Sequence, residues 1–218
     1  MGKLGKALIL VALILALSLS LFSCRTGAYW QRQGSDTQEI DVNTQEVNGS
    51  AKYIVYAALN SAGNMIPSTG EGSSAAIAAY AVVGYTGLVA ELVIPSTYTG
   101  TNLDATPHNV TKVIACESDG AGYAAYKLSM DGGAYTRNYA PLANNTVVTS
   151  IVFGSNVTSV GAGVCAGMVN LKSVTFTSTV ALGGYAFAAC AQLETVTGNY
   201  TVSDASKPPF FSSGYTPD

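Results

Sequence analysis

Hydrophobic residues recur with one spacing in five segments between residues 88 and 198. In each segment a hydrophobic residue is followed three positions later by a second one and then, after one polar or variable residue, by a third. In the fourth segment these residues are Leu171, Val174 and Phe176. The five segments are LVAELVIP (88–95), NVTKVIA (109–115), VVTSIVF (147–153), NLKSVTF (170–176) and QLETVTG (192–198). Each of them is expected to form a short strand.

The central hydrophobic residues of the five segments follow a regular period. They are Leu92, Val113, Ile151, Val174 and Val196, at intervals of 21, 38, 23 and 22 residues. We interpret the long interval as one unit with an insertion of about 15 residues. A period of roughly 20–29 residues with an L-x-x-L-x-L-like core is typical of leucine-rich repeats. In such a solenoid the inward side chains are covered only when neighbouring units stack.

The sequence therefore predicts a leucine-rich-repeat solenoid that is mainly β, with short irregular or helical convex segments. About four to five repeats and one inserted hairpin are expected. The segment LGGYAFAACAQL (182–193) is expected to return over the convex side to the next strand, as is VGAGVCAGMVNL (160–171) one unit earlier. The side chains expected inside the stack are Leu182, Ala186, Phe187, Cys190 and Leu193 in one segment, and Val160, Val164, Cys165, Met168 and Leu171 in the other.

These segments resemble the BspA-like, treponemal-type leucine-rich repeats of bacterial surface proteins. The unit of that family reads approximately I-G-x-x-A-F-x-x-C-x-x-L before the next strand, and residues 182–196, LGGYAFAACAQLETV, match it closely. YAVVGYTG (80–87) and LVIPSTY (92–98) are similar to the family's opening stretches, so the resemblance covers about residues 80–206. It implies adhesion to matrix proteins, other bacteria or cells, and it supplies no catalytic residues.

The N-terminus has the pattern of an export signal. Lys3 and Lys6 precede an uncharged apolar run over 7–22, which is typical of a secretory signal peptide, expected here over 1–23. LFSC (21–24) resembles the processing site of bacterial lipoproteins, which implies lipidation of Cys24 as the mature N-terminus. The alternative is ordinary secretion with cleavage near Ser18, Ser20 or Ser23. Lipid chains would hold the protein on a membrane without spanning it, which predicts a cell-envelope location at the outer membrane or cell surface.

The rest of the chain is expected to divide into four parts. Residues 24–52 are predicted to be the lipidated N-terminus and a polar tether, and 53–87 to be N-terminal strands or a cap, with strands at 53–58 and 79–83. Residues 88–202 contain the repeats, with the insertion at about 116–146. Residues 203–218 form a C-terminal cap or tail. We favour a cap, because a free tail would expose Phe210 and Phe211.

Charge and composition exclude several classes of partner and cofactor. Without Lys3 and Lys6 the chain has 8 basic and 13 acidic residues, a net charge of −5, and nucleic acid binding requires a basic face. Cys116, Cys165 and Cys190 form no C-x-x-C pair, and His108 is the only histidine. We therefore expect the cysteines to be buried small hydrophobic residues, and we expect no metal and no cofactor.

Catalytic patterns are weak throughout the sequence. His108 has no accompanying G-x-S-x-G motif, and GAGVCAG (161–167) lacks the spacing and the Gly-Lys ending of a phosphate-binding loop. Glu117, Asp119 and Asp131 lie near glycines but not in the order of a calcium loop. The sequence therefore predicts that the chain is not an enzyme.

Two surfaces are candidates for ligand binding. The insertion carries Tyr123, Tyr126, Tyr135, Arg137 and Tyr139, and tyrosine and arginine dominate protein interfaces. The alternative is that YKLSMDGGAYTRNY (126–139) is a hairpin packed beside the solenoid. The outward strand positions form the second surface. They are Ser150, Val152, Ser173, Thr175, Thr195 and Thr197, among which Thr175 and Thr195 are the principal candidates. Threonine there is also simply a good strand former.

The function that these features favour is a non-enzymatic cell-envelope lipoprotein, a surface binding or adhesion module that recognises an extracellular protein or glycan. The alternative is a periplasmic lipoprotein with a structural or envelope-assembly role and no host ligand.

Overall fold

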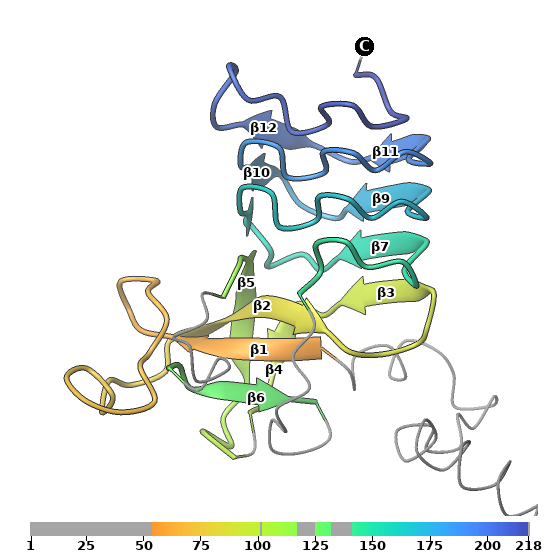
Figure 1. The fold of residues 1–218 in the computed structure, drawn as a ribbon. Coiled ribbons are helices and arrows are strands. Elements are labelled where there is room, and N and C mark those ends of the chain that lie inside the picture. The colour runs from red at the N-terminus through yellow and green to blue at the C-terminus, as the bar shows by residue number, and fades with distance from the viewer. Residues whose placement is uncertain (1–53, 101, 117–124, 132–140, 218) are drawn as a thin grey trace, which may run out of the picture. The chain divides into compact units, whose positions relative to one another are not determined.

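The described residues form two β-sheets that run through a stack of coils (Figure 1). The structure is a computed structural model and describes residues 54–100, 102–116, 125–131 and 141–217, all of which belong to one unit spanning Glu46–Asp218. Twelve strands are present in these residues, and none of their elements is a helix. The described part of the chain is thus mainly β, as the sequence predicted.

The first sheet contains four parallel strands in the order β11-β9-β7-β3. The strands are β3 (Glu91–Ile94), β7 (Ser150–Phe153), β9 (Ser173–Phe176) and β11 (Thr195–Thr197). They are four of the five predicted repeat strands, and their central residues Leu92, Ile151, Val174 and Val196 are paired in register. Parallel neighbours lie about 4.8 Å apart, so each inward side chain packs on its counterpart in the next coil.

The second sheet has the order β12-β10-β8-β5-β2-β1-β6, and β4 pairs with β5 outside this path. Its strands are β1 (Ile54–Leu59), β2 (Ala79–Tyr85), β4 (Thr97–Tyr98), β5 (His108–Val113), β6 (Leu128–Met130), β8 (Ser159–Val160), β10 (Val180–Leu182) and β12 (Tyr200–Val202). The strands predicted at 53–58 and 79–83 are confirmed as β1 and β2. Each coil therefore contributes one strand to each sheet.

The prediction that NVTKVIA (109–115) stacks in the same sheet as the other repeat strands is wrong. Leu92 pairs directly with Ile151, so no strand lies between β3 and β7. Val113 pairs instead with Val160, in the second sheet. The spacing misled the prediction because β5 also buries residues three apart, Val110 and Val113. Leu92 and Val113 are 21 residues apart because they lie in two different strands of one coil, β3 and β5, and not in equivalent strands of successive coils.

The segments that return from the second strand to the next coil are turns, and we call them return legs (161–171, 183–193 and 203–213). Backbone N–H groups of Gly163, Cys165 and Gly167 donate to carbonyls of the next coil at 3.0, 2.9 and 2.8 Å. The ten side chains that the sequence placed inside the stack are all buried. Cys190 Sγ lies 3.2 Å from the Cys165 carbonyl oxygen, and Cys116, Cys165 and Cys190 are free thiols.

The C-terminal segment packs against the return leg of the third coil (183–193). The N–H groups of Tyr185, Phe187 and Ala189 donate to carbonyl oxygens in residues 207–211, at 3.4, 2.8 and 2.9 Å. The ring of Phe210 stacks on Phe187, with 5.6 Å between centroids and 13° between planes. This segment therefore forms the return leg of the fourth coil.

Candidate binding face

The outward side of the four-stranded sheet presents two straight rows of side chains, which we call the strand face. One row consists of Glu91, Ser150, Ser173 and Thr195, and the other of Val93, Val152, Thr175 and Thr197. The members of each row are register partners on neighbouring strands, so they lie side by side. Alternate residues of the same strands point inward and are buried in β3, β7 and β9. The structure thus brings Thr175 and Thr195 onto one surface, as predicted.

The hydroxyl groups on the strand face make no hydrogen bonds within the described part of the protein. At the ends of the same strands, Thr149 Oγ1 donates to the Ala90 carbonyl at 3.3 Å, and Thr177 Oγ1 donates to the Phe153 carbonyl at 2.7 Å. In the described residues, by contrast, no hydrogen bond joins the side chains of Ser150, Ser173, Thr175, Thr195 or Thr197 to the protein. Five hydroxyls therefore remain as donors and acceptors toward solvent.

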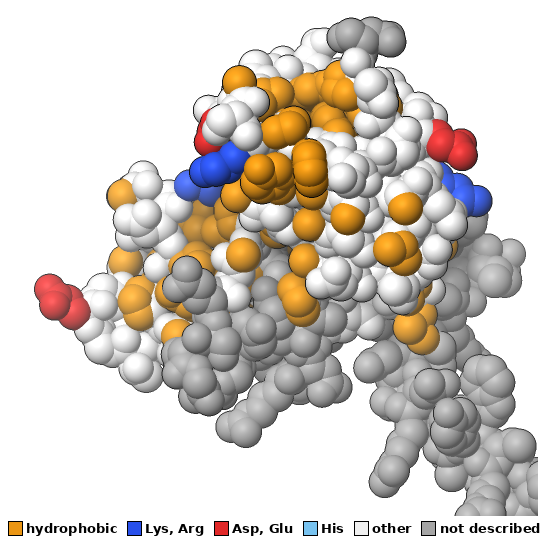
Figure 2. Space-filling view, turned by 45° about the horizontal axis from the view of Figure 1, so that its top comes forward, with side chains coloured by type: hydrophobic (Ala, Val, Ile, Leu, Met, Phe, Trp, Pro, Cys, Tyr) orange, Lys and Arg blue, Asp and Glu red, His pale blue; other side chains and the backbone are white. Residues whose placement is uncertain are grey.

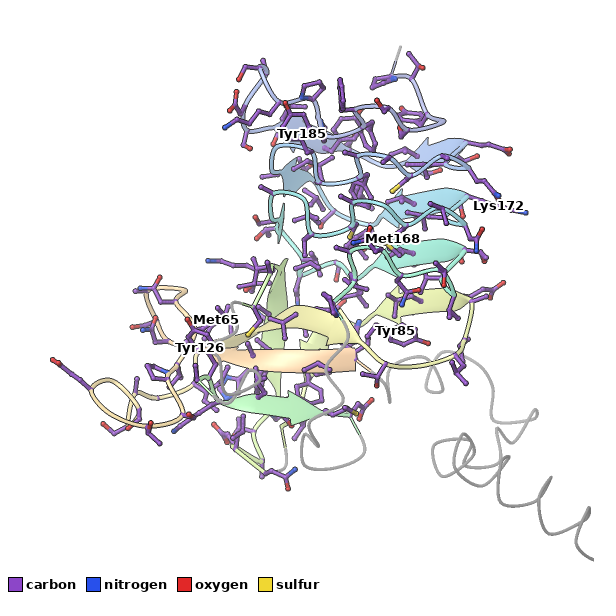
Figure 3. The ribbon with its side chains drawn as sticks, viewed as in Figure 1. Met65, Tyr85, Tyr126, Met168, Lys172 and Tyr185 are labelled. Atoms are coloured by element: carbon purple, nitrogen blue, oxygen red, sulfur yellow. The ribbon has the colours of Figure 1, made fainter. Side chains whose placement is uncertain are left out.

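Charge on the strand face is confined to its margins. Glu91 ends one row at the first coil, and the exposed residues Lys172 and Glu194 precede β9 and β11. Figure 3 shows Lys172 projecting away from the stack, whereas Met168 lies within it. The centre of the face is neutral, and its polar groups are all hydroxyls. Such a surface is suited to a ligand with many hydrogen-bonding groups and little charge.

The insertion is only partly described, and Tyr126 is the one candidate there that can be placed. It forms an antiparallel bridge with Pro67 and packs, half-buried, on a small cluster that includes Val55 and Cys116. Figure 3 shows it beside Met65. Residues 128–130 form β6, which pairs with β1. The second arm of the predicted hairpin, with Tyr135, Arg137 and Tyr139, lies outside the described residues, as do Tyr123 and Cys24.

A cluster of tyrosines that the sequence analysis did not single out lies under β1, β2 and β4. Tyr56 stacks on Tyr98 at 3.7 Å between ring centroids, and Tyr80 meets Tyr98 edge-on at 5.0 Å. Tyr98 Oη and Ser129 Oγ share a hydrogen bond of 2.6 Å. Burial raises the pKa of Tyr98 to about 12, so this hydroxyl stays neutral at physiological pH. The cluster is part of the core.

His108 and Asp104 form a hydrogen-bonded pair, and its role is structural. Its Nε2 lies 2.9 Å from Asp104 Oδ2, and Asp104 Oδ1 accepts a hydrogen bond from the Thr106 N–H at 2.8 Å. The hydrogen bond from His108 and those from Thr106 lower the pKa of Asp104 to about 2. The imidazole ring also meets the ring of Tyr80 edge-on, with 6.0 Å between the ring centroids. The pair therefore orders the turn that leads into β5.

In the part of the chain that the structure describes, no group of three His, Cys, Asp or Glu side chains could hold a metal ion. GAGVCAG (161–167) is a return leg, while Glu117 and Asp119 lie outside the described residues. Within the described ranges, no helix has the length and apolar character to cross a membrane.

One solved structure resembles part of this chain. It is that of a leucine rich cell surface protein from Faecalibacterium prausnitzii A2-165, with 20% sequence identity and a TM-score of 0.36. The similarity covers 56% of this chain and 28% of that protein, so this chain spans less than a third of the length of the protein it matches. No family model and no curated protein matches the chain.

Proposed function

We propose that the chain is a non-enzymatic binding module of the cell surface, which recognises a protein or a glycan through its strand face. The observation that carries the proposal is the register of five uncommitted hydroxyls on neighbouring strands of one rigid sheet. Side chains that the fold does not need, held at fixed spacing by a hydrogen-bonded scaffold, are preorganised for a ligand.

The chemistry of the face favours a neutral, hydrogen-bonding ligand. A buried hydroxyl without a partner costs free energy when the ligand binds, so the ligand has to supply matching groups. The hydroxyls and amides of a glycan do so, as does the backbone of an extended protein segment. The methyl groups of the threonines and the side chains of Val93 and Val152 add apolar contact between the polar groups.

Removal of the threonine hydroxyls is expected to weaken recognition. In Thr175→Val/Thr195→Val/Thr197→Val the strand propensity is kept, and three hydrogen bonds worth about 0.5–1.5 kcal/mol each are lost. Affinity should fall by more than about tenfold. The measurement is binding of the full chain to a panel of immobilised glycans and extracellular matrix proteins.

The matched control is Thr201→Val, which removes a hydroxyl from the exposed middle position of β12 in the other sheet. It should bind like the unchanged chain. If the triple variant also binds like the unchanged chain, to the same members of the panel, the strand face is not the binding site.

For the anchor, we propose that residues 1–23 direct export and that lipidated Cys24 holds the module at the cell surface, with residues 24–52 as a tether. Protease added to intact cells should then digest the chain, and Cys24→Ala should release it into the medium. Lysed cells are the control for digestibility. Protection until lysis would contradict surface display and would favour the structural role inside the envelope.

A further inference from the structure

Strand β11 is the open edge of the four-stranded sheet at the C-terminal end of the stack (Figure 1). The Thr195 N–H donates to the Lys172 carbonyl at 3.1 Å, which directs the backbone groups of Thr195 toward β9. Backbone groups alternate in direction along a strand. The N–H and C=O of Val196 therefore point away from β9, and no described strand pairs with them there.

The interior of the stack is also incompletely covered at this end. The central residues of the three preceding strands, Leu92, Ile151 and Val174, are buried, whereas Val196 is partly exposed. In the other sheet Leu182 is buried, but its partner Val202 is 44% exposed. Figure 2, in which this end is tilted toward the viewer, shows hydrophobic side chains gathered on it.

Lysine and proline, which commonly prevent strand pairing, are absent from this edge. Edge strands are protected by such residues, by a bulge or by being very short; β11 is short, with three residues, but TVTGNYTV (195–202) has no charged residue and no proline. The return leg of the same coil is different. Phe210 stacks on Phe187, so Pro208 occupies the position of Tyr185, whose N–H bonds to the next coil. Because Pro208 has no N–H, this leg cannot repeat that bond toward another parallel coil.

We propose that two copies of this chain associate end to end through β11, as an antiparallel pair centred on Val196. The contact is isologous, so the two-fold axis places each edge against itself. Val196 then lies opposite Val196 of the second copy and exchanges both backbone hydrogen bonds with it. Thr195 lies opposite Thr197, and Glu194 lies opposite Gly198, so no like charges meet.

The pairing extends the strand face as well as closing the core. Residues directly opposite each other in an antiparallel pair lie on one side of the sheet. The hydroxyl rows of the two copies therefore continue into each other across β11. The association goes beyond the proposed binding function and does not depend on it, because its evidence is the open edge and not the ligand.

A cysteine pair tests both the association and its register. In Thr195→Cys/Thr197→Cys, each cysteine of one copy faces a cysteine of the other in a non-hydrogen-bonded pair, with Cα atoms about 4.5 Å apart, within the range of a disulfide. With either single substitution the nearest cysteines are diagonal, about 7–8 Å apart. Cells that produce the full chain, together with their medium, are treated with a mild oxidant and analysed by non-reducing electrophoresis, so that the test does not depend on where the chain is located.

The double variant should give a band of twice the monomer mass, while the unchanged chain, both single variants and Thr175→Cys on β9 stay monomeric. Absence of the dimer in the double variant overturns the proposal, as does equal cross-linking in Thr175→Cys. A charge exchange checks the same register without disulfides. Thr195→Lys/Thr197→Lys should lose the dimer captured by a chemical cross-linker in the unchanged chain, and Thr195→Lys/Thr197→Glu should restore it. If both charged variants dimerise equally, the register is wrong and the proposal fails.

Discussion

Phe187→Ala is expected to destabilise the coil stack by about 3–5 kcal/mol, the usual range for truncation of a fully buried aromatic residue. Phe187 is buried between coils. Its ring centroid lies 6.3 Å from those of Phe153 and Phe176 and 5.6 Å from that of Phe210. It therefore connects the side chains of three coils, and their backbones are fixed by the inter-coil hydrogen bonds, so the cavity cannot collapse. Denaturant unfolding of the full chain, followed by circular dichroism, measures the loss.

The control for this prediction is Phe211→Ala. Phe211 is 57% exposed and its ring meets that of Tyr185 edge-on at 5.7 Å, so its truncation should cost less than about 1 kcal/mol. If the two variants lose similar stability, the ring of Phe187 does not hold the coils together, and the assignment of LGGYAFAACAQL to the stack interior is contradicted.

The interior of the stack could be predicted from the sequence because each coil buries hydrophobic side chains at equivalent positions. Leu182, Phe187 and Cys190 recur at a fixed distance from Val160, Cys165 and Met168, and a period of this kind has few structural solutions. Pairing of Val160 with Leu182 confirms the alignment. Local spacing alone failed at β5, since three-residue spacing of hydrophobic residues does not reveal which of two sheets a strand joins.

The backbone conformation of the return legs could not be predicted from residue types. Asn144, Gly167, Ala189 and Ser212 occupy successive coils, and all have positive φ, of 61°, 71°, 57° and 54°. Only glycine adopts this conformation without strain, and asparagine adopts it with little. The Ala189 N–H donates to the Phe211 carbonyl, and Gly214, two residues after Ser212, donates to the Cys190 carbonyl. These inter-coil hydrogen bonds act between residues 22 and 24 positions apart and leave no local signal.

The candidate site was predicted in part. The inward–outward alternation of the strands was sufficient to place Thr175 and Thr195 on one surface. The free state of their hydroxyls was not predictable, because Thr149 and Thr177 are the same residue type and donate to backbone carbonyls of the preceding coil. Whether a threonine hydroxyl donates to a backbone carbonyl depends on the position of the neighbouring coil. Tyr126 shows the opposite case, in which a residue typical of interfaces packs on a hydrophobic cluster.

Gly183→Ala is expected to separate the second and third coils and to cost about 3 kcal/mol, at the upper end of the usual overpacking range. A Cβ on Gly183 would lie 2.5 Å from the Ala162 backbone nitrogen and 2.7 Å from the Gly161 carbonyl carbon. Both are backbone atoms, which cannot rotate away as a side chain can. The third coil must therefore shift, which strains the 2.8 Å hydrogen bond from the Gly183 N–H to the Val160 carbonyl. The denaturation midpoint of the full chain measures the loss.

The matched control is Gly163→Ala in the preceding return leg, where an added Cβ meets nothing within 4 Å. Gly163 has a φ of 64°. This variant should therefore lose only about 1–2 kcal/mol of folding stability, the cost of placing alanine in the left-handed conformation. A larger loss in Gly183→Ala identifies close approach of the coils as the reason for glycine there. If Gly163→Ala is the more damaging variant, backbone conformation and not inter-coil distance limits the sequence of the return legs. The coils would then be able to move apart far enough to accept a methyl group.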